Sequence, residues 1–183
     1  MSNVSLRLLS TRFLLVFVVI ISISAGMIIA NGGREFDEVS VKQAQLAQFR
    51  DLDGVTRNIS HWEGAYRIVN FWATWCPPCR EEIPLFVELQ TEFQNINVTF
   101  IGVAVDDVER VRTFVAANGV NYPTLIGSGD ALRISEILGN NRSGLPYTVF
   151  LSPTGEIIDM HSGIVPEAKI RDFVAKIPSI SIK

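Results

Sequence analysis

The chain has 183 residues, which suffices for one well-packed domain with an appendage but not for two ordinary domains. Its composition, 48% hydrophobic and 19% charged, is that of a globular protein. Without the first 33 residues, the remainder carries 14 basic and 19 acidic side chains, a net charge of −5. An acidic domain lacks the electrostatic footprint of a nucleic-acid-binding protein, so nucleic acid is excluded as a partner.

The first predicted element is a transmembrane anchor at residues 13–33. This segment has no charged side chain and would span about 31 Å as a helix, which matches the hydrocarbon core of a bilayer. Arg7 and Arg12 precede it and acidic residues follow it, so the positive-inside rule makes residues 1–12 a cytoplasmic tail. We therefore expect a single-pass protein of the cell inner membrane with its domain on the periplasmic side. A signal sequence ending near residues 24–26 is the alternative, and it also exports the domain.

Residues 34–46 are interpreted as a polar linker, and the folded domain is expected to occupy residues 47–183. Its first feature is a β-hairpin with strands at 47–52 and 55–59, because Asp53-Gly54 is a strong hairpin turn. A short apolar run then predicts a buried strand at 68–73.

The rest of the domain alternates helices and strands. Apolar residues at helical spacing predict a helix at 78–93, followed by a buried strand at 98–105. Asp106 and Asp107 are expected to cap the next helix, which ends at Asn118-Gly119. The remaining predicted elements are a strand at 125–126, a helix at 130–138, strands at 147–151 and 156–161, and a helix at 166–177. This order predicts an α/β fold in which helices flank a central mixed β-sheet.

The two cysteines, Cys76 and Cys79, lie between the buried strand and the following helix. Backbone N–H groups and the helix dipole favour a thiolate at a helix N-terminus, which lowers the thiol pKa from its usual ~8.5. We expect Cys76, at the mouth of the helix, to be the attacking nucleophile and Cys79, one turn further in, to be the resolving thiol. Pro77 and Pro78 between them remove two backbone donors and stiffen the loop.

A metal site is the competing interpretation of this pair. Zinc and copper both need further ligands, and the chain has no second cysteine pair. His61 and His161 stand alone and are expected to be ordinary surface or loop residues. No metal and no cofactor besides the redox-active disulfide is therefore expected.

The stretch from Val69 to Pro84 reads VNFWATWCPPCREEIP and resembles the active-site signature of TlpA/ResA-like reductases of the thioredoxin family. The resemblance extends from about residue 46 to 177 and implies a thioredoxin fold with a central insert. It also implies a cis Leu145–Pro146 peptide beside Cys76, with the Leu145 backbone pairing with an extended substrate. Trp75 is expected to shield the disulfide and contact partners. Substrate contacts are also expected at Pro77 and Pro78.

Glu82 matches a glutamate that lies near the thiols in some members of this family. It could accept the Cys79 proton or raise both thiol pKa values by repulsion, or it could be an ordinary solvated helix residue. Asn70 stands where plain thioredoxin has a buried aspartate that accepts a proton. Because an amide cannot do so, Glu82 is the leading candidate for the third catalytic residue.

The leading functional hypothesis is a reductase of disulfides in exported proteins, such as apocytochrome c or a copper-site assembly protein. The resemblance implies electrons from a membrane-embedded thiol donor. Tyr147 replaces a glutamate common in cytochrome-specific members, so the client is kept general. A disulfide oxidase or isomerase would use the same atoms at a different reduction potential. A peroxidase lacks its expected upstream proline and threonine, and an anchored binding module with a structural disulfide is the non-catalytic alternative.

Overall fold

The computed structural model describes residues 38–177. The predicted cytoplasmic tail and the predicted anchor at 13–33 lie outside the described residues. Within residues 38–177, no helix is long and apolar enough to cross a membrane.

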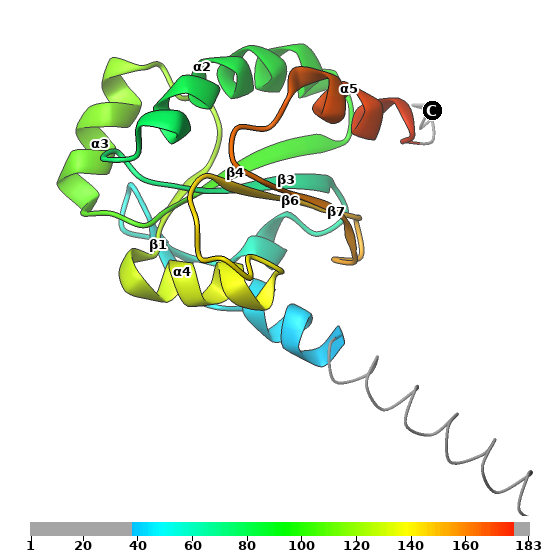
Figure 1. The fold of residues 1–183 in the computed structure, drawn as a ribbon, viewed down its shortest axis with the longest axis horizontal. Helices are drawn as coiled ribbons and strands as arrows, with labels where there is room; N and C mark the ends of the chain where they lie inside the picture. Colours follow the sequence, from blue (N-terminus) through cyan, green and yellow to red (C-terminus); the bar gives the residue numbers. More distant parts are fainter. Residues whose placement is uncertain (1–37, 178–183) are drawn as a thin grey trace, which may run out of the picture. The chain divides into compact units, whose positions relative to one another are not determined.

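One seven-stranded sheet organises the domain (Figure 1). Its strand order is β2-β1-β5-β4-β3-β6-β7. The three central strands β5, β4 and β3 are parallel and the outer pairs are antiparallel, so the sheet is mixed as predicted. The strands are β1 (Phe49–Asp51), β2 (Thr56–Arg57), β3 (Tyr66–Trp72), β4 (Val98–Ala104), β5 (Thr124–Ile126), β6 (Tyr147–Leu151) and β7 (Ile157–Ser162).

Helices cover both faces of this sheet. Helices α2, α3 and α5 lie on one face and α4 lies on the other (Figure 1). Their bounds are α2 (Pro77–Glu92), α3 (Val108–Ala117), α4 (Ser128–Ile137) and α5 (Glu167–Ala175), with short 3-10 turns η1 (Ile59–Trp62) and η2 (Phe93–Asn95).

Strand β3 shows why both faces must be covered. Successive side chains of a strand point to opposite faces, and six of the seven β3 residues are buried. Val69 and Phe71 enter the apolar cluster on the α4 face, whereas Ile68 and Trp72 enter clusters formed with α2, α3 and α5. Asn70 shares the second face with Trp72, which places a buried amide beneath α2.

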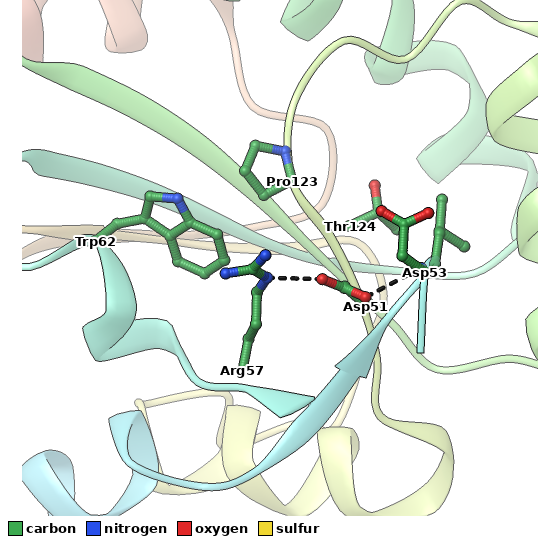
Figure 2. A pocket seen from close by; sticks show the side chains of 7 residues that line it. Asp51, Asp53, Arg57, Trp62, Pro123 and Thr124 are labelled. Atoms are coloured by element: carbon green, nitrogen blue, oxygen red, sulfur yellow. Dashed lines mark hydrogen bonds and ion pairs between the residues drawn. The ribbon is translucent and has the colours of Figure 1, made fainter. Parts of the chain in front are cut away.

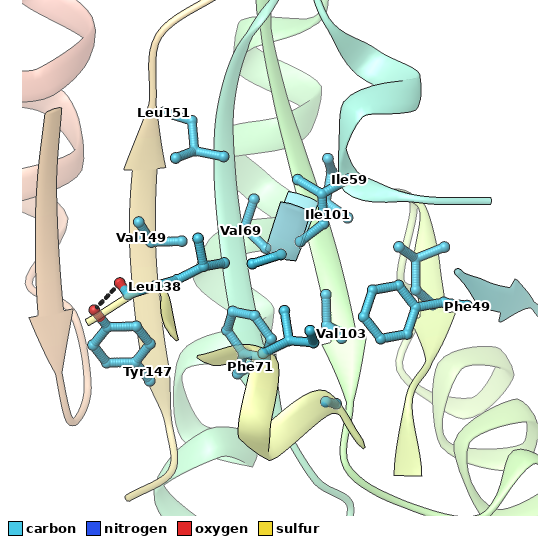
Figure 3. Close-up of a cluster of buried hydrophobic side chains, with 14 residues drawn as sticks. Phe49, Ile59, Val69, Phe71, Ile101, Val103, Leu138, Tyr147, Val149 and Leu151 are labelled. Carbon is cyan, nitrogen blue, oxygen red and sulfur yellow. Dashed lines mark hydrogen bonds between the residues drawn. The ribbon is translucent and has the colours of Figure 1, made fainter. Parts of the chain in front are cut away.

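The apolar cluster on the α4 face extends across the sheet from β1 to β6. Figure 3 shows Val69, Phe71 and Val149 packed together with residues of the neighbouring strands. The Tyr147 hydroxyl is buried and donates a 2.8 Å hydrogen bond to the Leu138 carbonyl at the end of α4. The start of β6 is therefore held rigidly against α4.

The architecture is a thioredoxin-like α/β fold, and the predicted order of strands and helices is confirmed. The hairpin strands are shorter than predicted. The Asp51 carboxylate accepts hydrogen bonds from the Asp53 and Val55 N–H groups and so closes the turn early, while η1 begins at Ile59, the last residue predicted for the second strand.

The predicted linker also differs from the structure. Residues 38–45 are helical, and the folded unit begins at Val41 rather than at residue 47. Ala44 and Gln45 are buried, and Gln45 Nε2 donates a 2.7 Å hydrogen bond to the Gly155 carbonyl. These contacts make the last residues of the predicted linker part of the domain.

Candidate active site

The two cysteines lie at the start of α2, just after the end of β3. Cys76 is the N-cap of α2 with an extended backbone, and Cys79 lies in the first turn. Their sulfurs form a disulfide with a Cα–Cα distance of 5.3 Å. Cys79 is fully buried, whereas Cys76 keeps 4% of its surface exposed. Of the two cysteines, Cys76 is therefore the more open to an incoming thiol or disulfide.

The two prolines decide how strongly the helix N-terminus can stabilise a thiolate. Pro77 and Pro78 occupy the first two helical positions and have no N–H to donate. The Cys79 N–H donates to Cys76 Sγ at 3.3 Å, and the Arg80 N–H is taken by the Cys76 carbonyl at 3.2 Å. A Cys76 thiolate thus meets one backbone donor where most helices would offer two.

Pro78→Ala is expected to lower the pKa of Cys76 in the reduced protein by about one unit. The substitution adds an N–H at the second helical position, which is one of the two donors that an N-cap side chain accepts. A hydrogen bond of ~1 kcal/mol corresponds to slightly less than one pKa unit. Ultraviolet absorbance of the thiolate as a function of pH measures the change. Pro84→Ala, at an exposed position inside the same helix, is the matched control and should leave the pKa unaltered. An unchanged or raised pKa in Pro78→Ala would contradict this account.

Glu82 lies one turn further along α2 and is 1% exposed. Its Oε1 accepts a 2.8 Å hydrogen bond from Asn70 Nδ2, and its Oε2 accepts a 3.1 Å hydrogen bond from the Val165 N–H. Burial raises the pKa of Glu82 to about 7, against the opposing effect of these two hydrogen bonds. This carboxyl group can therefore both accept and release a proton near neutral pH.

The position of Glu82 suits it to act on the resolving thiol. Residues three apart on a helix lie on one face, so Glu82 follows Cys79 on the buried side of α2. The solvated alternative is wrong, because the side chain is buried. Asn70 cannot accept a proton, but it orients the carboxylate that can. This pairing could not be predicted from the sequence, since the two residues lie on different elements.

A cis-proline loop adjoins the disulfide. The Leu145–Pro146 peptide is cis, and Leu145 packs against the apolar cluster that contains both cysteines. The Pro146 carbonyl accepts a 2.9 Å hydrogen bond from the Gly163 N–H. The loop after β7 is thereby tied to the cis-proline loop, and two residues later it supplies the Val165 N–H to Glu82. Sequence reasoning missed this second loop.

Exposed apolar side chains lie in the loops that adjoin the disulfide. Trp75, next to Cys76, is 60% exposed, and Ile164 in the loop after β7 is 43% exposed. Pro77 is exposed and Pro78 is half-buried. Among residues 38–177, Trp75 is the most open of the large apolar side chains. It is free to contact a partner.

A separate hollow of about 370 Å³ lies beside the hairpin (Figure 2). Figure 2 shows the ion pair of Arg57 with Asp51, at 2.6 Å, facing Trp62 across this hollow. None of its lining residues belongs to the loops that carry the cysteines or the cis-proline. We assign no chemistry to it.

The domain has a thioredoxin-like sheet, and a Cys-Pro-Pro-Cys disulfide lies at a helix N-terminus beside a cis-proline. These features together define the class of thiol–disulfide oxidoreductases. The AhpC/TSA family model matches residues 36–160, and the chain belongs to this family.

Individual relatives agree with this class. The chain is 31% identical over 134 residues to the thiol-disulfide oxidoreductase ResA of Halalkalibacterium halodurans, covering 73% of this chain and 74% of that protein. It is 28% identical over 129 residues to ResA of Bacillus subtilis, covering 68% of each. A thiol:disulfide interchange protein of the thioredoxin family from Chlorobium tepidum superposes with a TM-score of 0.63 at 27% identity, over 70% of this chain and 90% of its own. The protein is a thiol–disulfide oxidoreductase.

Proposed function

We propose that this oxidoreductase acts as a reductase, passing electrons from the Cys76–Cys79 dithiol to disulfides of exported proteins. The observation that carries the proposal is the weak support for thiolate charge at the site. Cys76 meets one backbone N–H, and Glu82 places a carboxyl group one turn below Cys79. Strongly oxidising members of this fold owe their potential to a stabilised reduced form. Weak support for the thiolate instead favours the disulfide, which makes the dithiol a good electron donor.

The reaction would proceed in two exchanges. The Cys76 thiolate attacks one sulfur of the client disulfide, forms a mixed disulfide and expels the other client sulfur as a thiolate. Cys79 then gives its proton to Glu82 and attacks Cys76 Sγ, which breaks the mixed disulfide and releases the second client thiolate. Two electrons pass to the client, and the Cys76–Cys79 disulfide is restored.

The client would dock against the apolar mouth of the site. Trp75 and Pro77, next to Cys76 in the chain, are exposed, and Leu145, which packs against the cluster that contains both cysteines, offers with Pro146 a backbone for an extended client segment. Tyr147 is 1% exposed and donates its hydroxyl to Leu138, so it is part of the core rather than a client contact. Tyr147 therefore provides no client-specific contact, and the proposed clients stay general, namely exported proteins such as apocytochrome c or copper-site assembly proteins.

The apolar run at residues 13–33 supports an anchor in the inner membrane, with the domain on the periplasmic side and re-reduced by a membrane-embedded thiol donor. A peroxidase is not proposed. Ala73 stands three residues before Cys76, and the proline and threonine expected upstream of a peroxidatic cysteine are absent.

The redox state of the pair in growing cells tests the direction of electron flow. Cells are quenched in acid, free thiols are alkylated with a maleimide of high mass, and the shift of the protein on a gel is read. A reductase supplied by a donor should carry mostly free thiols in the membrane fraction. A protein held mostly as the disulfide in an unstressed cell would indicate an oxidase and contradict the proposal.

A further inference from the structure

The loop that carries Cys76 is a tight turn from Ala73 to Cys76, closed by a 3.2 Å hydrogen bond from the Cys76 N–H to the Ala73 carbonyl. In the oxidised protein the disulfide also holds this loop, by linking Cys76 to Cys79 in the rigid first turn of α2. Once the disulfide opens, that cross-link is gone. Something else must then keep the attacking sulfur in place.

Asp106 supplies a second hold on this turn. Its Oδ2 accepts two hydrogen bonds from Thr74, one from the N–H at 2.9 Å and one from Oγ1 at 2.5 Å. Burial alone would raise the pKa of Asp106, but these bonds and that from the Asp107 N–H hold it below its usual value. The group is therefore a carboxylate, and its hydrogen bonds are of the stronger, charge-assisted kind.

Backbone hydrogen bonds of the neighbouring residues also fix the position of the Asp106 carboxylate. The Val105 N–H donates a 2.8 Å hydrogen bond to the Trp72 carbonyl, and Asp106 Oδ1 accepts a 2.7 Å hydrogen bond from the Asp107 N–H. Asp107 caps α3 through the N–H groups of Glu109 and Arg110. The sequence predicted that both aspartates cap this helix. In the structure only Asp107 does so, and Asp106 faces the turn that carries Cys76.

We propose that Asp106 is a positioning residue for thiol–disulfide exchange, and that its carboxylate holds Cys76 near Cys79 when the disulfide is open. The inference rests on exchange at this pair and not on the reductive direction. It predicts a change in the redox equilibrium. Without Asp106, the loop of the oxidised protein loses the hydrogen bonds from Thr74 but stays cross-linked by the disulfide. The loop of the reduced protein loses the same hydrogen bonds but gains conformational entropy, which offsets that loss. The disulfide therefore becomes easier to reduce.

The test is the equilibrium constant for oxidation of the Cys76–Cys79 dithiol by glutathione disulfide, measured in the full-length protein. Asp106→Ala should lower this constant about tenfold, which is ~30 mV toward a less negative potential. Asp106→Asn keeps an oxygen that can accept both Thr74 bonds but loses the charge that strengthens them, so it should shift the constant in the same direction by less than Asp106→Ala does. Asp107→Ala is the matched control, because it removes a helix cap of the same segment without touching Thr74.

The control separates positioning from general stability. A change that destabilises the oxidised and reduced forms equally lowers the melting temperature and leaves the equilibrium constant unaltered. Should Asp106→Ala fail to fold, Thr74→Val removes the hydroxyl donor alone and should shift the constant in the same direction. An unaltered constant in a folded Asp106→Ala or Thr74→Val variant overturns the inference. An equal shift in Asp107→Ala or Asp106→Asn overturns it too. A wild-type protein that did not exchange with glutathione would instead contradict the redox function itself.

Discussion

Cys79→Ser is expected to convert the protein into a trap that attacks disulfides and cannot release them, whereas Cys76→Ser should lose exchange completely. Cys76 caps α2 and keeps some exposed surface, whereas Cys79 is fully buried behind it. Attack therefore begins at Cys76, and without Cys79 the mixed disulfide has no internal thiol to break it. Mass spectrometry of each reduced variant after mixing with a disulfide-bonded peptide measures the adduct.

The double variant, with serine at positions 76 and 79, is the control for background reaction, because the chain has no other cysteine. It should form no adduct. Adducts that accumulated in Cys76→Ser through Cys79, at a rate equal to that of Cys79→Ser, would contradict the assignment of roles.

The free energy of unfolding of Glu82→Gln, relative to that of the wild type, should increase with pH. Burial raises the pKa of Glu82 to about 7 in the folded protein, above the reference value of 4.5. The stabilisation from the protonated form is thus fully present below about pH 4.5 and is lost as the pH rises through about 7. At ~1.4 kcal/mol per pKa unit, the difference in free energy of unfolding between the two proteins should change by about 3.5 kcal/mol over this range of pH.

Urea unfolding of the oxidised proteins at several pH values from acid to alkaline measures this difference. Glutamine keeps the acceptor for Asn70 and loses the one for the Val165 N–H, so an offset independent of pH is also expected. Glu81→Gln, at an exposed neighbouring position, is the matched control and should show no such trend. If the difference in free energy of unfolding between Glu82→Gln and the wild type did not vary with pH, Glu82 would not titrate in this range.

The order of strands and helices could be predicted from the sequence because it follows local rules. Apolar runs such as that of β3 indicate buried strands, and turns such as Asp53-Gly54 are recognised from two residues. The cysteine pair could be placed on a helix N-terminus for the same reason. Its chemistry followed from that context and from the shortage of metal ligands, since spacing alone does not distinguish a redox pair from half a metal site.

Contacts between elements could not be predicted in this way. The hydrogen bond from Asn70 to Glu82 joins residues 12 apart, one on a strand and one on a helix, and depends on how α2 packs over β3. The contact of Asp106 with Thr74 spans 32 residues. Asp106 and Asp107 are equivalent as helix caps in the sequence, and only the path of the chain leaving β4 decides which one faces the active-site turn.

The start of the domain was misjudged for a different reason. Residues 41–46 contain small and amide side chains that show no strong apolar period, so the sequence favoured a linker. Their order comes from tertiary contacts, namely the burial of Ala44 and the hydrogen bond from Gln45 to Gly155. Such contacts fix a segment whose own sequence specifies little.

The reduction potential of the Cys76–Cys79 disulfide tests the central claim most directly, that this pair serves as an electron donor. The oxidised protein is equilibrated with buffers of oxidised and reduced dithiothreitol, and the thiol fraction is read after acid quenching. Weak support for the thiolate predicts a potential below about −200 mV, toward that of thioredoxin at about −270 mV. A potential above about −150 mV lies at the oxidising end of the range and would contradict the claim.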